Sequence, residues 1–180
     1  RAVAADRNTL ETPLMSGQWW LVSASSFPRD GERLHTCIEG RYVTVFRHKG
    51  RLSCIDSICH HAGGPLTLGN VIDIEDIGKS VVSCPWHKFL VSIDDGIKAY
   101  KGVDIIGGVP TPTGWKTGKV VQRSHAVVEK GQNVFVRLHI PEEEGWTCAS
   151  DNDASSELCA QAFEMHHEVP QLYDGDPSMM

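Results

Sequence analysis

The chain has 180 residues, of which 41% are hydrophobic and 22% charged, a composition that suits one domain with a hydrophobic core. No apolar run is long enough for a membrane-spanning helix, and no basic run is interleaved with aromatic residues as in nucleic-acid-binding proteins. Residues 1–140 contain all 17 Lys and Arg and 13 of the 23 Asp and Glu, so residues 141–180 form a strongly acidic end.

In chain order, a flexible polar lead-in over residues 1–17 is expected before a first strand that begins near Gln18. Residues 40–58 and 124–140 are typical of hairpins, because alternating apolar runs flank turns that contain Gly. Two short β-rich runs, 80–84 and 88–93, lie between them. We therefore predict one all-β domain over residues 18–140 and an acidic C-terminal extension over 141–180, with a helix over 155–168.

The six cysteines come without a secretory signal segment or an Asn-x-Ser/Thr acceptor for glycosylation. This combination indicates a reducing compartment and free thiols rather than a disulfide-stabilised secreted domain. We expect a soluble intracellular protein in the cytoplasm or in an organelle, either chloroplast or mitochondrion. Residues 1–9 would suit the remainder of a cleaved transit peptide.

Two loops carry the residues that could bind a metal. Cys59-x-His61 and Cys84-x-x-His87 each supply one thiolate and one imidazole at the end of a strand-like run. A closed tetrahedral zinc site would take such a set, and so would a two-iron, two-sulfide cluster with both Cys on one iron and both His on the other. Mixed Cys-His pairs suit the cluster better. Gly63 and Gly64 in the first loop allow backbone amides to turn toward its sulfides, and Pro65 and Pro85 stiffen the two loops.

These loops resemble the signature of the Rieske [2Fe–2S] proteins, which is C-x-H, a spacer, and C-x-x-H. The segments "CHHAGGPL", "CPWHKF" and "KTGKVVQRSHAVV" are similar, more narrowly, to the Rieske domain-containing proteins of animals and algae, over residues 19–140. The resemblance implies an antiparallel β-sandwich of stacked sheets, with a cluster-binding subdomain formed by the two loops. It places Cys59 and Cys84 on the buried iron and His61 and His87 on the outer iron. It also implies a third, proline-bearing loop over the cluster, which we expect at residues 107–112.

Some positions depart from the respiratory and photosynthetic members of this family. Those proteins carry an extra disulfide-bonded Cys in each loop, where this chain has Gly64 and Trp86. Phe89 stands where they have a hydroxyl donor. Fewer hydrogen bonds to the cluster sulfur atoms stabilise the reduced cluster less. We therefore predict a reduction potential in the lower part of the range of roughly −150 to +300 mV that is typical of Rieske clusters. His60 is expected to be exposed beside the cluster, and it is the alternative ligand to His61.

The resemblance implies a one-electron carrier that passes electrons from a reductase to an oxygenase or another acceptor. We expect a monomer that is not itself an enzyme, because the sequence shows no second catalytic motif. Two alternatives stay open. The chain could be the Rieske subunit or a fragment of an oxygenase system, or it could be a zinc-stabilised binding module.

Overall fold

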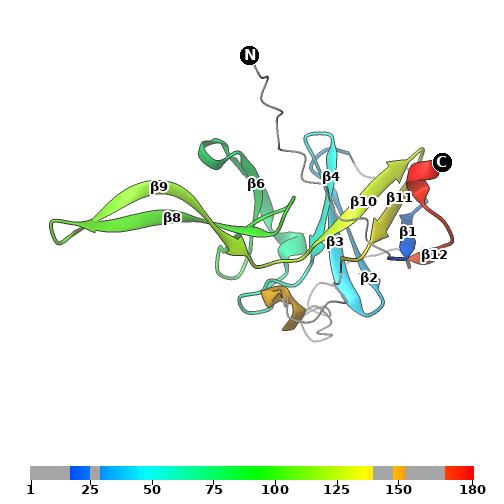
Figure 1. Cartoon of the computed structure of the whole chain (residues 1–180), viewed down its shortest axis with the longest axis horizontal. Helices are drawn as coiled ribbons and strands as arrows, with labels where there is room; N and C mark the ends of the chain where they lie inside the picture. Colours follow the sequence, from blue (N-terminus) through cyan, green and yellow to red (C-terminus); the bar gives the residue numbers. More distant parts are fainter. Residues whose placement is uncertain (1–16, 25–28, 140–147, 153–168) are drawn as a thin grey trace, which may run out of the picture.

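The computed structural model describes residues 17–24, 29–139, 148–152 and 169–180. Their strands form two antiparallel sheets (Figure 1). The first has seven strands in the order β12-β1-β11-β10-β4-β3-β2, and the second has five in the order β5-β6-β7-β8-β9. The strands of the first sheet are β1 (Trp19–Ser23), β2 (Arg33–Ile38), β3 (Arg41–His48), β4 (Arg51–Asp56), β10 (Ser124–Lys130), β11 (Asn133–Arg137) and β12 (Gln171–Tyr173). Those of the second are β5 (Asn70–Ile74), β6 (Lys79–Ser83), β7 (Leu90–Ser92), β8 (Ile97–Ile106) and β9 (Val109–Val120).

The all-β fold of stacked antiparallel sheets is confirmed. Four short 3₁₀ helices complete the described residues: η1 (Leu66–Leu68), η2 (Glu75–Ile77), η3 (Ala149–Asn152) and η4 (Pro177–Met179). The helix expected over residues 155–168 lies outside the described residues. In the part of the chain that the structure describes, no helix is long and apolar enough to span a membrane.

Both predicted hairpins are present. β3 and β4 are joined by Lys49 and Gly50, with φ of 51° and 72°. Two successive residues with positive φ make the tight turn whose twist matches that of the flanking strands. β10 and β11 are joined through Gly131, with φ of 61°. The local turn chemistry therefore sets the register of the large sheet at these two places.

The hydrophobic core that matters for the candidate site lies between the two sheets. Phe46 and Ile55 come from the seven-stranded sheet, and Val82 and Val91 come from the five-stranded sheet. All four side chains are at most 1% exposed. Cys59, Leu66, Cys84, Ile93 and Val121 are buried in the same cluster, so the two metal-binding motifs begin inside the core rather than on the surface.

Strands β8 and β9, at one edge of the five-stranded sheet, form a long hairpin whose outer part projects beyond the other strands, and we call this hairpin the arm (Figure 1). The prediction that residues 107–112 cover the metal site is wrong. Gly107 and Gly108, with φ of 61° and 82°, make the turn at the tip of the arm, and the residues after them belong to β9. This Gly-Gly pair takes the positive φ angles of a two-residue hairpin turn, so the segment closes a ribbon and cannot fold back over the core.

The C-terminal residues take part in the body of the fold. β12 pairs with β1, with Leu172 opposite Trp20, and so forms one edge of the seven-stranded sheet. The backbone N–H of Ser150, in η3, donates to the carbonyl of Val121 at 3.2 Å. Parts of residues 141–180 therefore contribute to the same structure as residues 18–140.

Candidate metal centre

The first loop is a tight turn built on Cys59. The Cys59 amide donates to the carbonyl of Gly64 at 2.8 Å, and the Gly63 amide donates back to the carbonyl of Cys59 at 2.9 Å. Gly63 has φ of 73°, in the left-handed region that glycine adopts at little cost. The loop begins at the isolated bridge between Ile58 and Pro65, so its two ends are fixed to each other.

The second loop repeats this backbone frame. The Cys84 amide donates to the carbonyl of Phe89 at 2.8 Å, and the Lys88 amide donates to the carbonyl of Cys84 at 2.9 Å. In both loops the Cys carbonyl therefore binds the fourth residue after it, and the Cys amide binds the fifth. Lys88 takes the place of Gly63 with φ of 59°, a conformation that costs a non-glycine residue energy. The sequence gives no sign of this correspondence, because one loop has glycine at that position and the other has lysine.

The two candidate thiols lie together in the core. Cys59 is 1% exposed and Cys84 is 2% exposed, and the two thiols are close enough to interact. Burial and the neighbouring Cys84 raise the pKa of Cys59 to about 12. The backbone N–H groups of His61 and Ala62 point at the Cys59 sulfur and act in the opposite direction, because they stabilise its thiolate. These amides are therefore donors to the Cys59 sulfur in the first loop.

The two candidate imidazoles lie together outside the thiols. The ring centroids of His61 and His87 are 4.8 Å apart at an interplanar angle of 85°, and both side chains are exposed. The ring of Phe89 stacks on His61 with its centroid at 4.2 Å. The four candidate ligands are thus an inner pair of thiols and an outer pair of imidazoles. Among the described residues, no three or more His, Cys, Asp or Glu side chains form a group that could hold a single metal ion.

Gly64 provides the close approach between the loops. A Cβ atom at this position would lie 2.6 Å from the Cys84 sulfur and 3.2 Å from the ring of Trp86. Because no carbon can approach sulfur so closely, the second thiol can sit beside the first loop only where that loop has no side chain. Trp86 is itself 50% exposed and covers Gly64 from the solvent side. These features fit a two-iron, two-sulfide cluster with mixed ligands. The thiol pair is buried, the imidazole pair is exposed, and the loops approach each other where the first loop has no side chain.

Comparison with known proteins decides the family. A family model described as soluble Rieske-type ferredoxin matches residues 24–140. The chain belongs to the soluble Rieske-type ferredoxins. A Rieske domain-containing protein from Homo sapiens is 31% identical over 130 residues, which covers 72% of this chain and 79% of that protein. Members of this family bind a Rieske [2Fe–2S] cluster.

Solved structures also resemble this ferredoxin. The terminal oxygenase of carbazole 1,9a-dioxygenase from Novosphingobium sp. KA1 matches with a TM-score of 0.50 and 23% identity, over 72% of this chain and 32% of that one. The ferredoxin of carbazole 1,9a-dioxygenase from Nocardioides aromaticivorans IC177 matches with a TM-score of 0.46 and 21% identity, over 66% of this chain and 96% of that one. At these identities the oxygenase structure supports the fold alone.

A residue that sequence reasoning missed holds the first loop of the ferredoxin in place. The side chain of Gln122 is fully buried and donates from Nε2 to the carbonyls of Ile58 at 2.7 Å and Asp56 at 3.1 Å. Its Oε1 accepts from the amide of His60 at 3.2 Å. His60 is half-buried rather than exposed, with its ring 5.5 Å from that of Phe89. Gln122 lies in the segment "KTGKVVQRSHAVV" that carries the family resemblance, but it belongs to neither metal-ligand motif, so no role was expected for it.

Gln122 is in turn tied to a buried charge network. Asp56, which is fully buried, accepts two hydrogen bonds of 2.6 Å from Arg41, and the Asp56 carboxylate also accepts from the hydroxyl of Ser150. Asp151 binds Arg41 at 2.7 Å and Arg123 at 2.6 Å, so one carboxylate joins two guanidinium groups. Burial acts to raise both pKa values, but hydrogen bonds with His125 and Arg41 hold the pKa of Asp56 below its usual range, and hydrogen bonds with Arg123 and Arg41 do the same for Asp151. The network connects the C-terminal η3 to the strand end from which the first loop departs.

Proposed function

We propose that this ferredoxin carries one electron at a time on a Rieske [2Fe–2S] cluster. Cys59 and Cys84 would bind the inner iron, and His61 and His87 would bind the outer iron. The observation that carries the proposal is the difference in burial, with both thiols in the core and both imidazoles at the surface. When bound, such a cluster supplies reversible one-electron chemistry at a potential of roughly −150 to +300 mV.

The residues around the ligands have separate roles. The His61 and Ala62 amides stabilise negative charge on the Cys59 sulfur. Phe89, which has no hydroxyl to donate, stacks on His61 and keeps that imidazole in one orientation. The exposed edges of the two imidazoles are the surface nearest the outer iron, and they are therefore where a partner would deliver or accept the electron. Because few hydrogen bonds are donated to the cluster sulfur atoms, we place the reduction potential in the lower part of the range of Rieske clusters.

The partners would be redox proteins, with a reductase as the donor and an oxygenase or another acceptor. The chain would act as a monomer and would not itself be an enzyme. The described cysteines, at positions 37, 54, 59, 84 and 148, are all free thiols, which supports a reducing intracellular compartment. The boundaries 1–17, 18–140 and 141–180 for the lead-in, the cluster domain and the acidic extension stay a prediction from the sequence. The pairing of β12 with β1 joins part of the extension to the sheet of the cluster domain.

The test is the cluster itself. We expect the purified chain to be red-brown, to contain iron and acid-labile sulfide in equal amounts, and to give after dithionite treatment the electron paramagnetic resonance signal of low average g-value typical of mixed Cys and His ligands. Zinc without sulfide would instead support the binding-module alternative. A partner that co-purifies and confers substrate-dependent activity would support the oxygenase-subunit alternative.

Neighbouring histidines provide a matched pair for the ligand assignment. His61→Gln should abolish the signal, because it removes a ligand to the outer iron. His60→Gln should preserve the signal, because the His60 side chain points toward Gln122 and Phe89. The reverse result would reassign the ligand to His60.

A further inference from the structure

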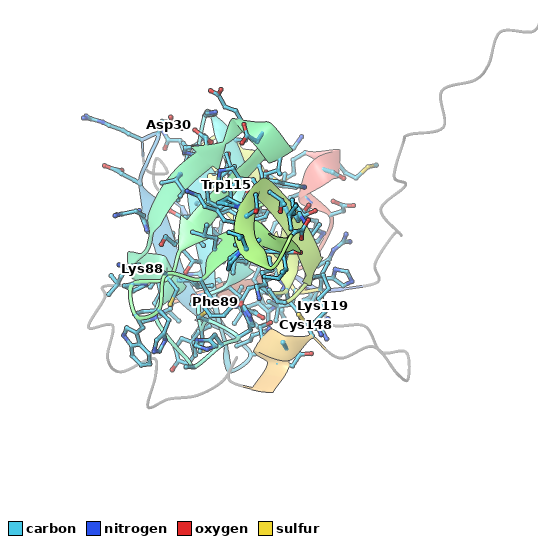
Figure 2. The ribbon with its side chains drawn as sticks, turned by 90° about the vertical axis from the view of Figure 1, so that its left-hand side faces the viewer. Asp30, Lys88, Phe89, Trp115, Lys119 and Cys148 are labelled. Atoms are coloured by element: carbon cyan, nitrogen blue, oxygen red, sulfur yellow. The ribbon has the colours of Figure 1, made fainter. Side chains whose placement is uncertain are left out.

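The arm leaves the rest of the fold soon after it begins. The last pair between β7 and β8 joins Leu90 to Ala99, and from Tyr100 outward β8 pairs only with β9 in the described part of the chain. Figure 2, which looks along the arm, shows the labelled Trp115 on it and Lys88 and Phe89 of the second loop below it. A two-stranded ribbon that stands alone in water is only marginally stable. The outer part of the arm is therefore expected to have a partner surface.

The tip of this ribbon is apolar on both faces. Val103 is 58% exposed, Ile105 68%, Ile106 61% and Val109 62%. Ile106 lies opposite Val109 on one face, and Ile105 lies opposite Pro110 on the other, because neighbouring residues of a strand point in opposite directions. A flat protein surface would cover one face of the ribbon and leave the other in water. A medium that surrounds the tip would bury both.

Basic and aromatic side chains lie immediately behind the tip. Lys101 and Lys116 flank Tyr100 and Trp115, and the Lys101 ammonium lies 5.2 Å from the centre of the Trp115 ring. Residues 97–120 contain four Lys and a single acidic residue, in a chain whose net charge is −6. That acidic residue, Asp104, faces Lys116 at 3.6 Å. Trp115 is half-buried and packs against Ile74, Val81 and Ala99, so the side chains outward of it are the lysines and the apolar tip. An apolar end followed by Lys is the order in which side chains cross a membrane–water interface.

We propose that the arm docks on an anionic lipid surface, with the side chains of residues 103–109 among the headgroups and the lysines on the phosphates. The depth is suitable, since residues 103–106 rise about 10 Å at about 3.3 Å each, and interfacial segments are buried by about 5–10 Å. Pairing of the β9 edge with another strand is disfavoured, because Pro110 and Pro112 have no N–H to donate. The inference does not depend on the proposed electron carrier.

Docking of the arm would also orient the metal centre. The Lys98 ammonium, at the base of the arm, lies 5.0 Å from the centre of the Phe89 ring, and Phe89 stacks on His61. The arm is thus in contact with the surface formed by the candidate imidazoles. A protein held at the membrane by its arm would hold this surface at the base of the arm, about 16 Å behind Val103 at about 3.3 Å per residue, with its orientation to the bilayer fixed.

The experiment is co-sedimentation of the full chain with vesicles at physiological salt. We expect binding to vesicles of equal parts phosphatidylcholine and phosphatidylserine, and at least tenfold weaker binding to phosphatidylcholine alone. The triple variant Ile105→Ser, Ile106→Ser, Val109→Ser should lose at least nine-tenths of the binding. Its matched control is Val169→Ser with Leu172→Ser, which removes exposed apolar side chains outside the arm.

The electrostatic part has its own pair of variants. Lys101→Glu with Lys116→Glu should abolish binding, whereas Arg29→Glu with Arg51→Glu changes the net charge equally away from the arm and should preserve it. For insertion, Ile106→Trp should give a tryptophan whose emission shifts to the blue and is quenched by brominated lipid. No binding by the full chain, or equal binding by the tip variant and its control, would overturn the proposal. Concentration-dependent self-association that the tip variant loses, without lipid binding, would assign the arm to a protein interface instead.

Discussion

The side chain of Gln122 accepts a hydrogen bond from the backbone amide of His60 at 3.2 Å, although 62 positions separate the two residues. Gln122 thereby fixes the one residue that lies between the first candidate thiol and the first candidate imidazole. Its two donor bonds to Asp56 and Ile58 fix the strand end before them. The geometry of the first loop consequently depends on a residue that cannot itself bind a metal.

Replacement of Gln122 by Ala is expected to loosen this loop. Three backbone groups would lose their partner in a fully buried place, which should cost about 1–3 kcal/mol of the free energy of unfolding. We expect the cluster to be lost several times faster on dilution into chelator, as followed by visible absorbance. Gln132→Ala, in the exposed β10–β11 turn, is the control and should be unchanged. Equal rates for the two variants would contradict the role of Gln122.

Gly64→Ala should prevent cluster binding while leaving the rest of the fold in place. The added methyl group would lie 2.6 Å from the Cys84 sulfur, so the two loops would have to separate. We expect the iron content to fall at least fivefold, with an unchanged far-ultraviolet circular dichroism spectrum. In Gly118→Ala the nearest atoms would be at 3.7 Å, and full iron content is expected. An iron-replete Gly64→Ala protein would show that the contact is not needed.

Asp151→Asn should destabilise the fold through the two guanidinium groups that share this carboxylate. Hydrogen bonds to charged groups contribute about 1.5–3 kcal/mol each, and the side chain of Asp151 is 24% exposed, so we expect a total loss of about 2 kcal/mol. The measurement is the urea midpoint of unfolding at constant m-value. Asp104→Asn, on the exposed arm, removes the same charge and should change the midpoint little.

The stability of the fold should decrease as the pH falls below about 6.5. The side chain of His125 is buried, its Nδ1 accepts from the amide of His139 at 3.1 Å, and its Nε2 lies 3.0 Å from Asp56. Burial lowers the pKa of His125 and also that of His139. Below the unfolded pKa, these histidines are therefore protonated in the unfolded chain while they are still neutral in the folded chain. Stability is therefore greatest above the unfolded pKa of about 6.5 and is lost progressively below it.

Thermal unfolding between pH 7.5 and 5.5 tests this linkage. His125→Gln should show a shallower decrease in melting temperature than the parent chain, while the remaining slope reflects His60 and His139, whose pKa values burial also lowers. The lowered pKa of Asp56 adds a second decrease below about pH 4, where the unfolded carboxylate becomes protonated. Identical slopes for parent and variant would exclude His125 as a source.

The sequence was informative where the structure is local. The hairpin turns at Lys49-Gly50 and at Gly131 could be predicted because Gly supplies the required backbone angles within the turn itself. The C-x-H and C-x-x-H motifs also identified two loops whose Cys residues meet in the core. The extent of the arm was missed, although Gly107-Gly108 between apolar residues is a hairpin signal, because family resemblance assigned that segment to a cover over the cluster.

The parts that could not be predicted depend on contacts between distant segments. Nothing local marks Gln122 as the support of the first loop, because its partners lie more than 60 positions earlier. Lys88 likewise looks like an ordinary loop lysine, and only the hydrogen bonds around Cys84 show that it replaces a glycine of the first loop. The sequence predicted that all acidic residues after position 140 belong to one acidic extension. In the structure, Asp151 is instead bound to Arg41 and Arg123.

The shared carboxylate of Asp151 changes where this ferredoxin can be shortened. The family match ends at residue 140, and a recombinant protein trimmed there would retain every motif residue. It would nevertheless lack the anion that Arg41 and Arg123 have in common, and the hydroxyl of Ser150 that binds Asp56. For this chain, the smallest piece that folds as well as the whole is expected to extend at least to residue 152, beyond the limit drawn by homology.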